Sequence, residues 1–325
     1  MSIARNEGAV WRRNSVRSAA VVLPVVVVAA VVVSEWSLID SSARRLGAAD
    51  GEWLTVACCA AFLTWVCAAA AQQGAVVERL PAGGLLAAQF AASAANHVLP
   101  AGLGGNAVNL RFLVRRGLSA TRAVAALAIR AAAAVIARVA LLVAVLALFP
   151  GALSIRRVVH GRRNLPDHPV LIAAGVLVAV AAGCLLTRCA RGLGSRLREF
   201  TASVAHDVRA LHRMRPRIAA LWGGSLAFPA MHAAVVVSVM RAVHAPVPVS
   251  GVVAAYLCAS TATGWLPTPA GLGSLDAALG LALVTAGASA VTATSAVLGY
   301  RLVTAWLPLI PGVVVLAVLV RRRQL

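Results

Sequence analysis

Long apolar stretches alternate with short polar segments along the whole chain, and most of the polar segments contain arginine. The apolar stretches match the length of about 20 residues that an α-helix needs to cross the hydrocarbon core of a bilayer. This pattern predicts an all-α, polytopic membrane protein with about six full transmembrane helices. The predicted spans are 19–39, 53–73, 120–149, 169–187, 218–240 and 292–320.

Two further apolar segments, 83–118 and 248–289, are interrupted by glycine and proline clusters at 100–105 and 267–273. Proline and glycine break helices, and non-helical backbone at membrane depth is tolerated where it is buried in protein or lines a water-filled cavity. We therefore expect two broken or re-entrant helical hairpins that meet at a central cavity.

The two interrupted segments form an internal repeat. The pentapeptide Pro-Ala-Gly-Leu-Gly occurs at 100–104 and again at 269–273. In both copies a Gly-x-Ser sequence and an arginine inside an apolar stretch follow in the same order. These matching positions are Gly117, Ser119 and Arg130 in the first copy, and Gly287, Ser289 and Arg301 in the second.

An odd number of predicted spans separates the two copies, so the second copy is expected to be inverted relative to the first. Inverted repeats with broken helices near the midplane are typical of transporters. We expect one integral membrane domain over 1–325, with repeat 1 at about 53–149 and repeat 2 at about 218–320.

The charge pattern assigns sides to the spans. The chain is 61% hydrophobic with a formal charge of +20, and all 30 basic residues are arginine. A basic chain can bind nucleic acid, but here the arginines flank apolar stretches, as the positive-inside rule describes. We expect both termini to be cytoplasmic, in a bacterial inner membrane, with no nucleic-acid partner. The segment 188–217 is predicted to be an amphipathic cytoplasmic helix on the membrane surface, or else a plain linker.

Chemistry-bearing motifs do not stand out. The six cysteines have no zinc-type spacing, and neither a nucleophile elbow, a phosphate-binding loop nor a pair of carboxylates is present. The sequence therefore favours a protein that is not an enzyme, with no cofactor and no metal.

Four ionisable residues in apolar segments are the best candidates for function: Arg130, Arg138, Asp276 and Arg301. A charge at membrane depth is costly and usually functional. Arg130 and Arg138 lie about 80° apart around one helix, so both can face one cavity. One hypothesis is that the arginines bind an anionic headgroup and that Asp276 switches between them. The alternative is a structural ion pair at Asp276, with the remaining arginines extending to the interface.

The interrupted segments supply further candidates. Asn96 and His97 precede the first glycine turn, where His97 either relays protons or caps a half-helix. Glycines at helix starts present backbone N–H groups to anions. These candidate glycines are Gly104, Gly105, Gly271 and Gly273. His232, in the middle of a predicted span, is expected to form a hydrogen bond between helices.

These residues resemble the signatures of a known family. The first signature consists of Asn96, Leu99, Pro100, Gly104, Gly105, Arg111, Arg116, Gly117, Ser119 and Ala123. The second consists of Pro267, Pro269, Gly271, Leu272, Gly273, Asp276 and Ala277, followed by Tyr300, Arg301, Trp306, Leu307 and Pro308. Over about 20–320 the chain resembles the transmembrane, flippase-like domain of lysylphosphatidylglycerol synthases, with Asp276 where that family usually has Glu.

The resemblance implies a protein that translocates a lipid or polyprenyl-linked lipid between leaflets. Because the chain ends at Leu325, the aminoacyl transfer of the full-length synthases is not expected. The expected partners are membrane lipids, anionic or phosphate-containing, and an alternative partner is a separately encoded enzyme. The alternatives are a membrane subunit of a lipid-headgroup-modifying enzyme, a non-transporting membrane scaffold, or a transporter of ions or small solutes.

Overall fold

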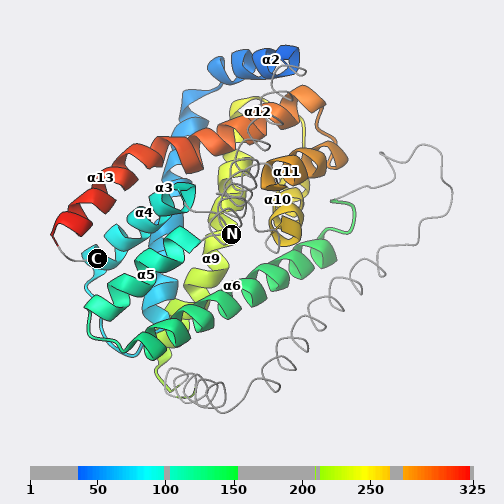
Figure 1. Ribbon diagram of the computed structural model, residues 1–325. Coiled ribbons are helices and arrows are strands. Elements are labelled where there is room, and N and C mark those ends of the chain that lie inside the picture. Colours follow the sequence, from blue (N-terminus) through cyan, green and yellow to red (C-terminus); the bar gives the residue numbers. More distant parts are fainter. Residues whose placement is uncertain (1–35, 99–102, 153–208, 210–212, 264–273, 323–325) are drawn as a thin grey trace, which may run out of the picture.

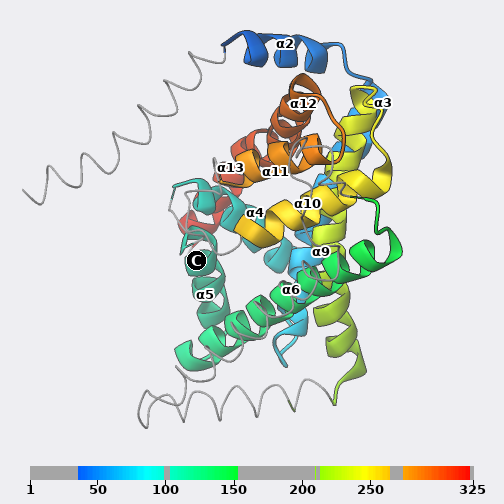
Figure 2. The same cartoon turned by 90° about the vertical axis from the view of Figure 1, so that its right-hand side faces the viewer.

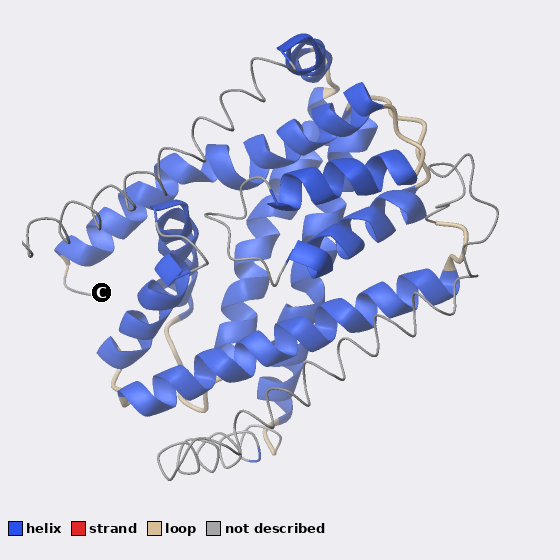
Figure 3. Cartoon of the chain, turned by 45° about the vertical axis from the view of Figure 1, so that its right-hand side comes forward, coloured by secondary structure: helices blue, strands red, loops and turns tan. Residues whose placement is uncertain are grey.

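The computed structural model describes residues 36–98, 103–152, 209, 213–263 and 274–322. Within these residues every regular element is helical, which confirms the all-α prediction (Figure 3). The helices are α2 (Trp36–Gly47), α3 (Gly51–Gly74), α4 (Ala82–Val98), α5 (Leu103–Arg115), α6 (Ala120–Leu148), α9 (Arg215–Ala242), α10 (Val249–Thr263), α11 (Ser274–Thr285), α12 (Ala290–Arg301), the π-helix η4 (Leu302–Trp306) and α13 (Leu307–Arg321).

Four helical stretches of the described residues are long and apolar enough to cross a membrane. They are α3, α6, α9 and the continuous stretch Ala290–Arg321, which contains α12, η4 and α13. These stretches agree with the spans predicted at 53–73, 120–149, 218–240 and 292–320. The predicted span at 169–187, and most of 19–39 and of the linker at 188–217, lie outside the described residues.

Helix α2 (Trp36–Gly47) begins within the span predicted at 19–39 and continues beyond it, into residues for which the sequence predicts no helix. It carries an ion pair between Asp40 and Arg44, one helical turn apart, and the Ser42 hydroxyl donates to the carbonyl of Val291 on α12. The hydrophobic pattern of these residues gives only a weak helix signal. Contact with α12, which is far away in the sequence, stabilises this short helix.

The two interrupted segments form pairs of short helices, α4 with α5 and α10 with α11 (Figure 1). The members have 17, 13, 15 and 12 residues, so each is shorter than the about 20 residues of a full span. The turns 99–102 and 264–273 lie outside the described residues. The broken-hairpin prediction is confirmed to this extent.

The turns that follow the two hairpins have the same local structure. Gly117 and Gly287 both have a positive φ, which glycine adopts without a Cβ clash. The next helices start at Ser119 and Ser289, and each serine side chain accepts a hydrogen bond from the backbone N–H three residues later. The two turns therefore share one local backbone structure, and the inverted repeat stays a prediction.

Helices α3 and α9 are the central pair, and they run antiparallel (Figures 1 and 2). The start of α3 is joined to the end of α9 because the N–H of Asp50 donates to the carbonyl of Ala242. At the other end, a Cβ on Gly74 would collide with the backbone of Leu221. A Cβ on Gly224 would lie 2.6 Å from the backbone nitrogen of Ala71. Small residues at helix contacts of this kind drive packing inside membranes.

Arg217, near the start of α9, contacts the backbone at the end of α3. Its guanidinium donates to the carbonyls of Gln73, Val77 and Glu78 at 2.9–3.0 Å. The last carbonyls of a helix have no intrahelical donor, so a buried arginine that satisfies them holds α9 to the end of α3. Arg217 is therefore a structural residue.

Two hydrophobic clusters flank the central pair. The first joins α3 and α9 to α10, α11 and α12, and its largest members include Leu257, Leu279 and Leu283. The second joins α4, α5 and the first half of α6, around Phe112 and Leu113. Helix α6 contacts both clusters, because its first half belongs to the second cluster and its last third packs on the first.

We expect Gly224→Ala to lower the melting temperature of the detergent-solubilised protein, because the new methyl group forces α3 and α9 apart. Overpacking of this kind costs about 1–3 kcal/mol. The matched control is Gly223→Ala, since a Cβ on that neighbouring glycine has nothing within 4 Å. The control should melt at the same or a higher temperature, because alanine favours the helix. Equal melting of the two variants would contradict the close contact.

Candidate functional site

Arg130 lies on α6 and begins a chain of hydrogen bonds through buried polar side chains. Its Nη1 donates to Oε1 of Gln89 on α4 at 3.4 Å. Nε2 of Gln89 then donates to Oδ1 of Asn109 on α5 at 2.8 Å. Nδ2 of Asn109 donates to the carbonyl of Gly105 at 2.9 Å. The guanidinium is therefore oriented by neutral groups, and no carboxylate of the described residues compensates its positive charge.

The same chain of hydrogen bonds ends at the first interrupted segment. The N–H of Gly105 donates to Oδ1 of Asn96 at 2.6 Å, and a Cβ on Gly104 would collide with the carbonyl of Ala95. These glycines thus allow α5 to approach α4 closely. In the structure, the N–H of Gly105 is donated within the protein, and anion binding at Asn96, Gly104 and Gly105 stays a prediction.

Arg138 lies farther along α6 and reaches the second half of the molecule. Its Nη1 donates to the carbonyl of Ser260 on α10 at 3.3 Å. Its Nε is buried and has no hydrogen-bond partner. Among the residues that the structure describes, no carboxylate forms an ion pair with Arg138 or Arg130.

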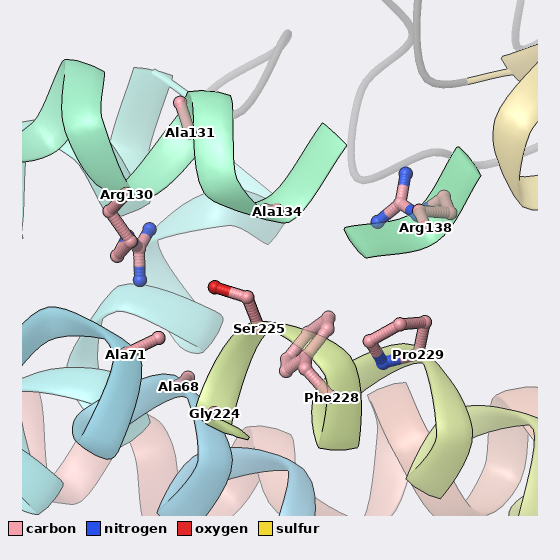
Figure 4. Close-up of a pocket in the computed structure, with 10 residues that line it drawn as sticks. All are labelled: Ala68, Ala71, Arg130, Ala131, Ala134, Arg138, Gly224, Ser225, Phe228 and Pro229. Carbon is pink, nitrogen blue, oxygen red and sulfur yellow. The ribbon is translucent and has the colours of Figure 1, made fainter. Parts of the chain in front are cut away.

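A cleft of about 120 Å³ separates the two arginines. Figure 4 shows Arg130 and Arg138 on the α6 side of the cleft, with the side chain of Arg130 extending toward α3 and α9. The opposite wall belongs to α3 and α9, with Ser225 between the two guanidinium groups. The full lining is Ala68, Ala71, Arg130, Ala131, Ala134, Arg138, Gly224, Ser225, Phe228 and Pro229.

Small and helix-distorting residues make room for this cleft. Alanine and glycine face it from α3, α6 and α9 where larger side chains would fill it. Pro229 lies inside α9 and has no N–H, so the carbonyl of Ser225 loses its usual helical donor. The cleft lies where α6 passes from one hydrophobic cluster to the other. One cluster contains residues of α4 and α5 and the other contains residues of α10 and α11, so the cleft lies between the two interrupted segments.

Asp276 and Arg301 form an ion pair, with Oδ1 of Asp276 2.5 Å from Nε of Arg301. The carboxylate lies in the first turn of α11 and the guanidinium in the last turn of α12. The carboxylate is therefore at a helix start, where the dipole favours it, whereas Arg301 lies inside the continuous stretch Ala290–Arg321. The structure pairs Asp276 with Arg301 and places Arg130 in a different environment.

A buried polar contact joins α9 to α12 beside this ion pair. The hydroxyl of Tyr300 and Nδ1 of His232 are 3.0 Å apart, which confirms the predicted hydrogen bond between helices at His232. After Arg301 the helix widens into η4, where the N–H of Leu307 donates five residues back, to the carbonyl of Leu302. The widening precedes Pro308, which cannot donate to the residue four before it.

Comparison with known proteins identifies the family. Residues 18–312 match the family model described as the lysylphosphatidylglycerol synthase TM region. The chain belongs to this family. A search of curated proteins finds no match. Family membership and the four long apolar helices together establish a multi-pass membrane protein.

The structure describes part of the site that the sequence predicts. Arg130, Arg138, Asp276, Arg301, Asn96, Gly104 and Gly105 are placed as above. Gly271 and Gly273 lie outside the described residues, and of His97 the structure describes the backbone alone.

The sequence did not single out three polar residues that lie near the arginines of this family member. They are Gln89, Asn109 and Ser225. Gln89 and Asn109 carried a usable signal, because buried amides in apolar helices usually form helix–helix hydrogen bonds. Ser225 carried none, since a serine among alanines and glycines is ordinary in a membrane helix.

We expect Asp276→Asn to lower the melting temperature, because it removes the carboxylate that pairs with Arg301, whose side chain is 11% exposed. Breaking a buried pair costs about 3–5 kcal/mol, and partial exposure of Asp276 reduces the loss to about 1–3 kcal/mol. The double variant Asp276→Asn/Arg301→Gln should recover part of this loss, since it removes the unpaired charge. A double variant less stable than Asp276→Asn would show that the pair is not an isolated interaction.

Proposed function

We propose that this protein translocates a phosphate-containing lipid, or a polyprenyl-linked lipid, between the leaflets of a bacterial inner membrane. The observation that carries this proposal is the cleft between membrane helices, which contains two arginines without a carboxylate partner among the described residues. Membership in the lysylphosphatidylglycerol synthase TM-region family supports a role at membrane lipids.

The physical reason is the cost of moving a headgroup through hydrocarbon. A charged or strongly polar group resists entry into an apolar layer unless it is paired there. Arg130 and Arg138 offer planar forks of donors that fit phosphate oxygens. A headgroup in the cleft would exchange water for these donors while its acyl or polyprenyl tails stay in the lipid.

The arrangement of the two halves supports movement around the cleft. We propose that the α4–α5 and α10–α11 hairpins belong to inverted repeats, with both termini cytoplasmic. In this arrangement the hairpins rock against each other and expose the cleft to one side and then to the other. The Asp276–Arg301 pair serves as a fixed contact of the second repeat, and the headgroup site belongs to the first repeat.

The test is transbilayer movement of fluorescent lipids in proteoliposomes, with anionic, zwitterionic and aminoacylated headgroups compared. We expect movement that depends on the headgroup. Arg130→Gln and Arg138→Gln should each slow it roughly tenfold or more, because each removes a charge-assisted contact worth about 1.5–3 kcal/mol. The matched control is Arg122→Gln on the same helix, since Arg122 lies at the start of α6 and pairs with Glu78.

Two results would contradict the translocase. If no lipid moves in vesicles that contain folded protein, a scaffold or a membrane subunit of a headgroup-modifying enzyme becomes the better explanation. If Arg122→Gln slows movement as much as Arg130→Gln, the effect comes from general surface charge, and the cleft is not the path.

A further inference from the structure

Ser225 has an unusual environment for a serine in a membrane helix. It is 2% exposed, and its hydroxyl has no hydrogen-bond partner among the residues that the structure describes. A helical serine ordinarily donates to the carbonyl one turn before it. A buried hydroxyl without a partner costs about 1–3 kcal/mol, so a retained one requires an explanation such as a missing ligand.

The hydroxyl of Ser225 points into the cleft rather than into the α3–α9 contact. In Figure 4 its oxygen is directed into the space between α6 and α9, on the side of Arg130. Arg138, whose buried Nε also has no partner, lies on the other side of that space. The two residues that carry these unsatisfied donors therefore line the same cleft.

The volume suits a compact group of several heavy atoms. One water requires roughly 10–15 Å³ of such space, and the cleft offers about 120 Å³. Apart from the two arginines and Ser225, its lining is apolar. A small anion would find donors from three residues there, two guanidinium groups and one hydroxyl, and no opposing carboxylate among the described lining residues.

Arg301, another arginine inside an apolar segment, does not take part in anion binding at the cleft. Arg301 is paired with Asp276, whereas Arg130 is held by the amide of Gln89 and Arg138 by a backbone carbonyl. Both of the latter groups are neutral, so the cleft keeps its positive charge. An anion that enters it gains charge-assisted hydrogen bonds, which are the strong ones in an apolar environment.

We propose that the α6–α9 cleft is a phosphate-binding site in which Arg130 and Arg138 compensate the charge and Ser225 donates a hydrogen bond to a phosphate oxygen. The assignment to a lipid headgroup rests on the proposed function. The site itself would accept a phosphate group from a lipid or from free phosphate, because the chemistry of recognition is the same.

The test measures equilibrium binding of small probes to the full chain in detergent. The shift in melting temperature that each probe causes reports its binding. The probes are dioctanoyl phosphatidylglycerol, inorganic phosphate, and dioctanoylglycerol, which has the same tails but no phosphate. We expect a phosphate-bearing probe to stabilise the protein and dioctanoylglycerol not to. Ser225→Ala should weaken binding roughly tenfold, as expected for one hydrogen bond to a charged group.

Without ligand, Ser225→Ala should melt at the same or a higher temperature, because it removes an unsatisfied hydroxyl. A merely structural serine predicts the opposite. The matched control is Ser295→Ala, since Ser295 is also buried but donates to the carbonyl of Val291 at 2.8 Å. This control should melt at a lower temperature and bind the probe as the wild type does.

The outcomes separate the site from the translocase. Unchanged binding in Ser225→Ala, or equal stabilisation by dioctanoylglycerol, would overturn the site even if lipid movement is observed. Binding of the lipid probe that Ser225→Ala weakens supports a headgroup site. Equally sensitive binding of inorganic phosphate alone supports the site and assigns it to a free anion. Binding without lipid movement leaves the site standing and contradicts the translocase.

Discussion

Helices α3 and α9 touch backbone to backbone at Gly74 and Gly224, and the other helices are arranged around this contact. Helices in a bilayer are already removed from water, so the hydrophobic effect drives little of their association. Close van der Waals packing of small residues therefore holds them together. Arg217 reinforces the contact by satisfying the carbonyls at the end of α3. The antiparallel pair thereby fixes one wall of the cleft.

The interior positive charges of the described residues are stabilised in two different ways. Arg301 has a carboxylate, and that carboxylate lies at the start of α11, where the helix dipole favours it. Arg130 is oriented through Gln89 and Asn109, which are neutral. The first arrangement cancels charge and gives a stable contact. The second orients a guanidinium and keeps its charge available for a ligand.

The repeat explains this difference once helix geometry is considered. The sequence suggests that Arg130 and Arg301 are equivalent, and both follow a serine cap. Arg301 lies one residue farther from Ser289 than Arg130 lies from Ser119. One residue rotates a side chain by about 100° around the helix, so Arg301 faces Asp276. Tyr300 takes the angular position of Arg130 and contacts His232.

Hydrophobic periodicity, glycine–proline clusters and arginine placement determined the helical class, the long helices and the two hairpins, because each is a local property of the chain. They also identified Arg130 and Arg138 as intramembrane charges. Tertiary structure decided which carboxylate pairs with Arg301 and which amide holds Arg130. It also revealed Ser225, since a buried hydroxyl is distinguished from any other serine by what surrounds it. Partners from distant helices set those surroundings, and no local pattern encodes them.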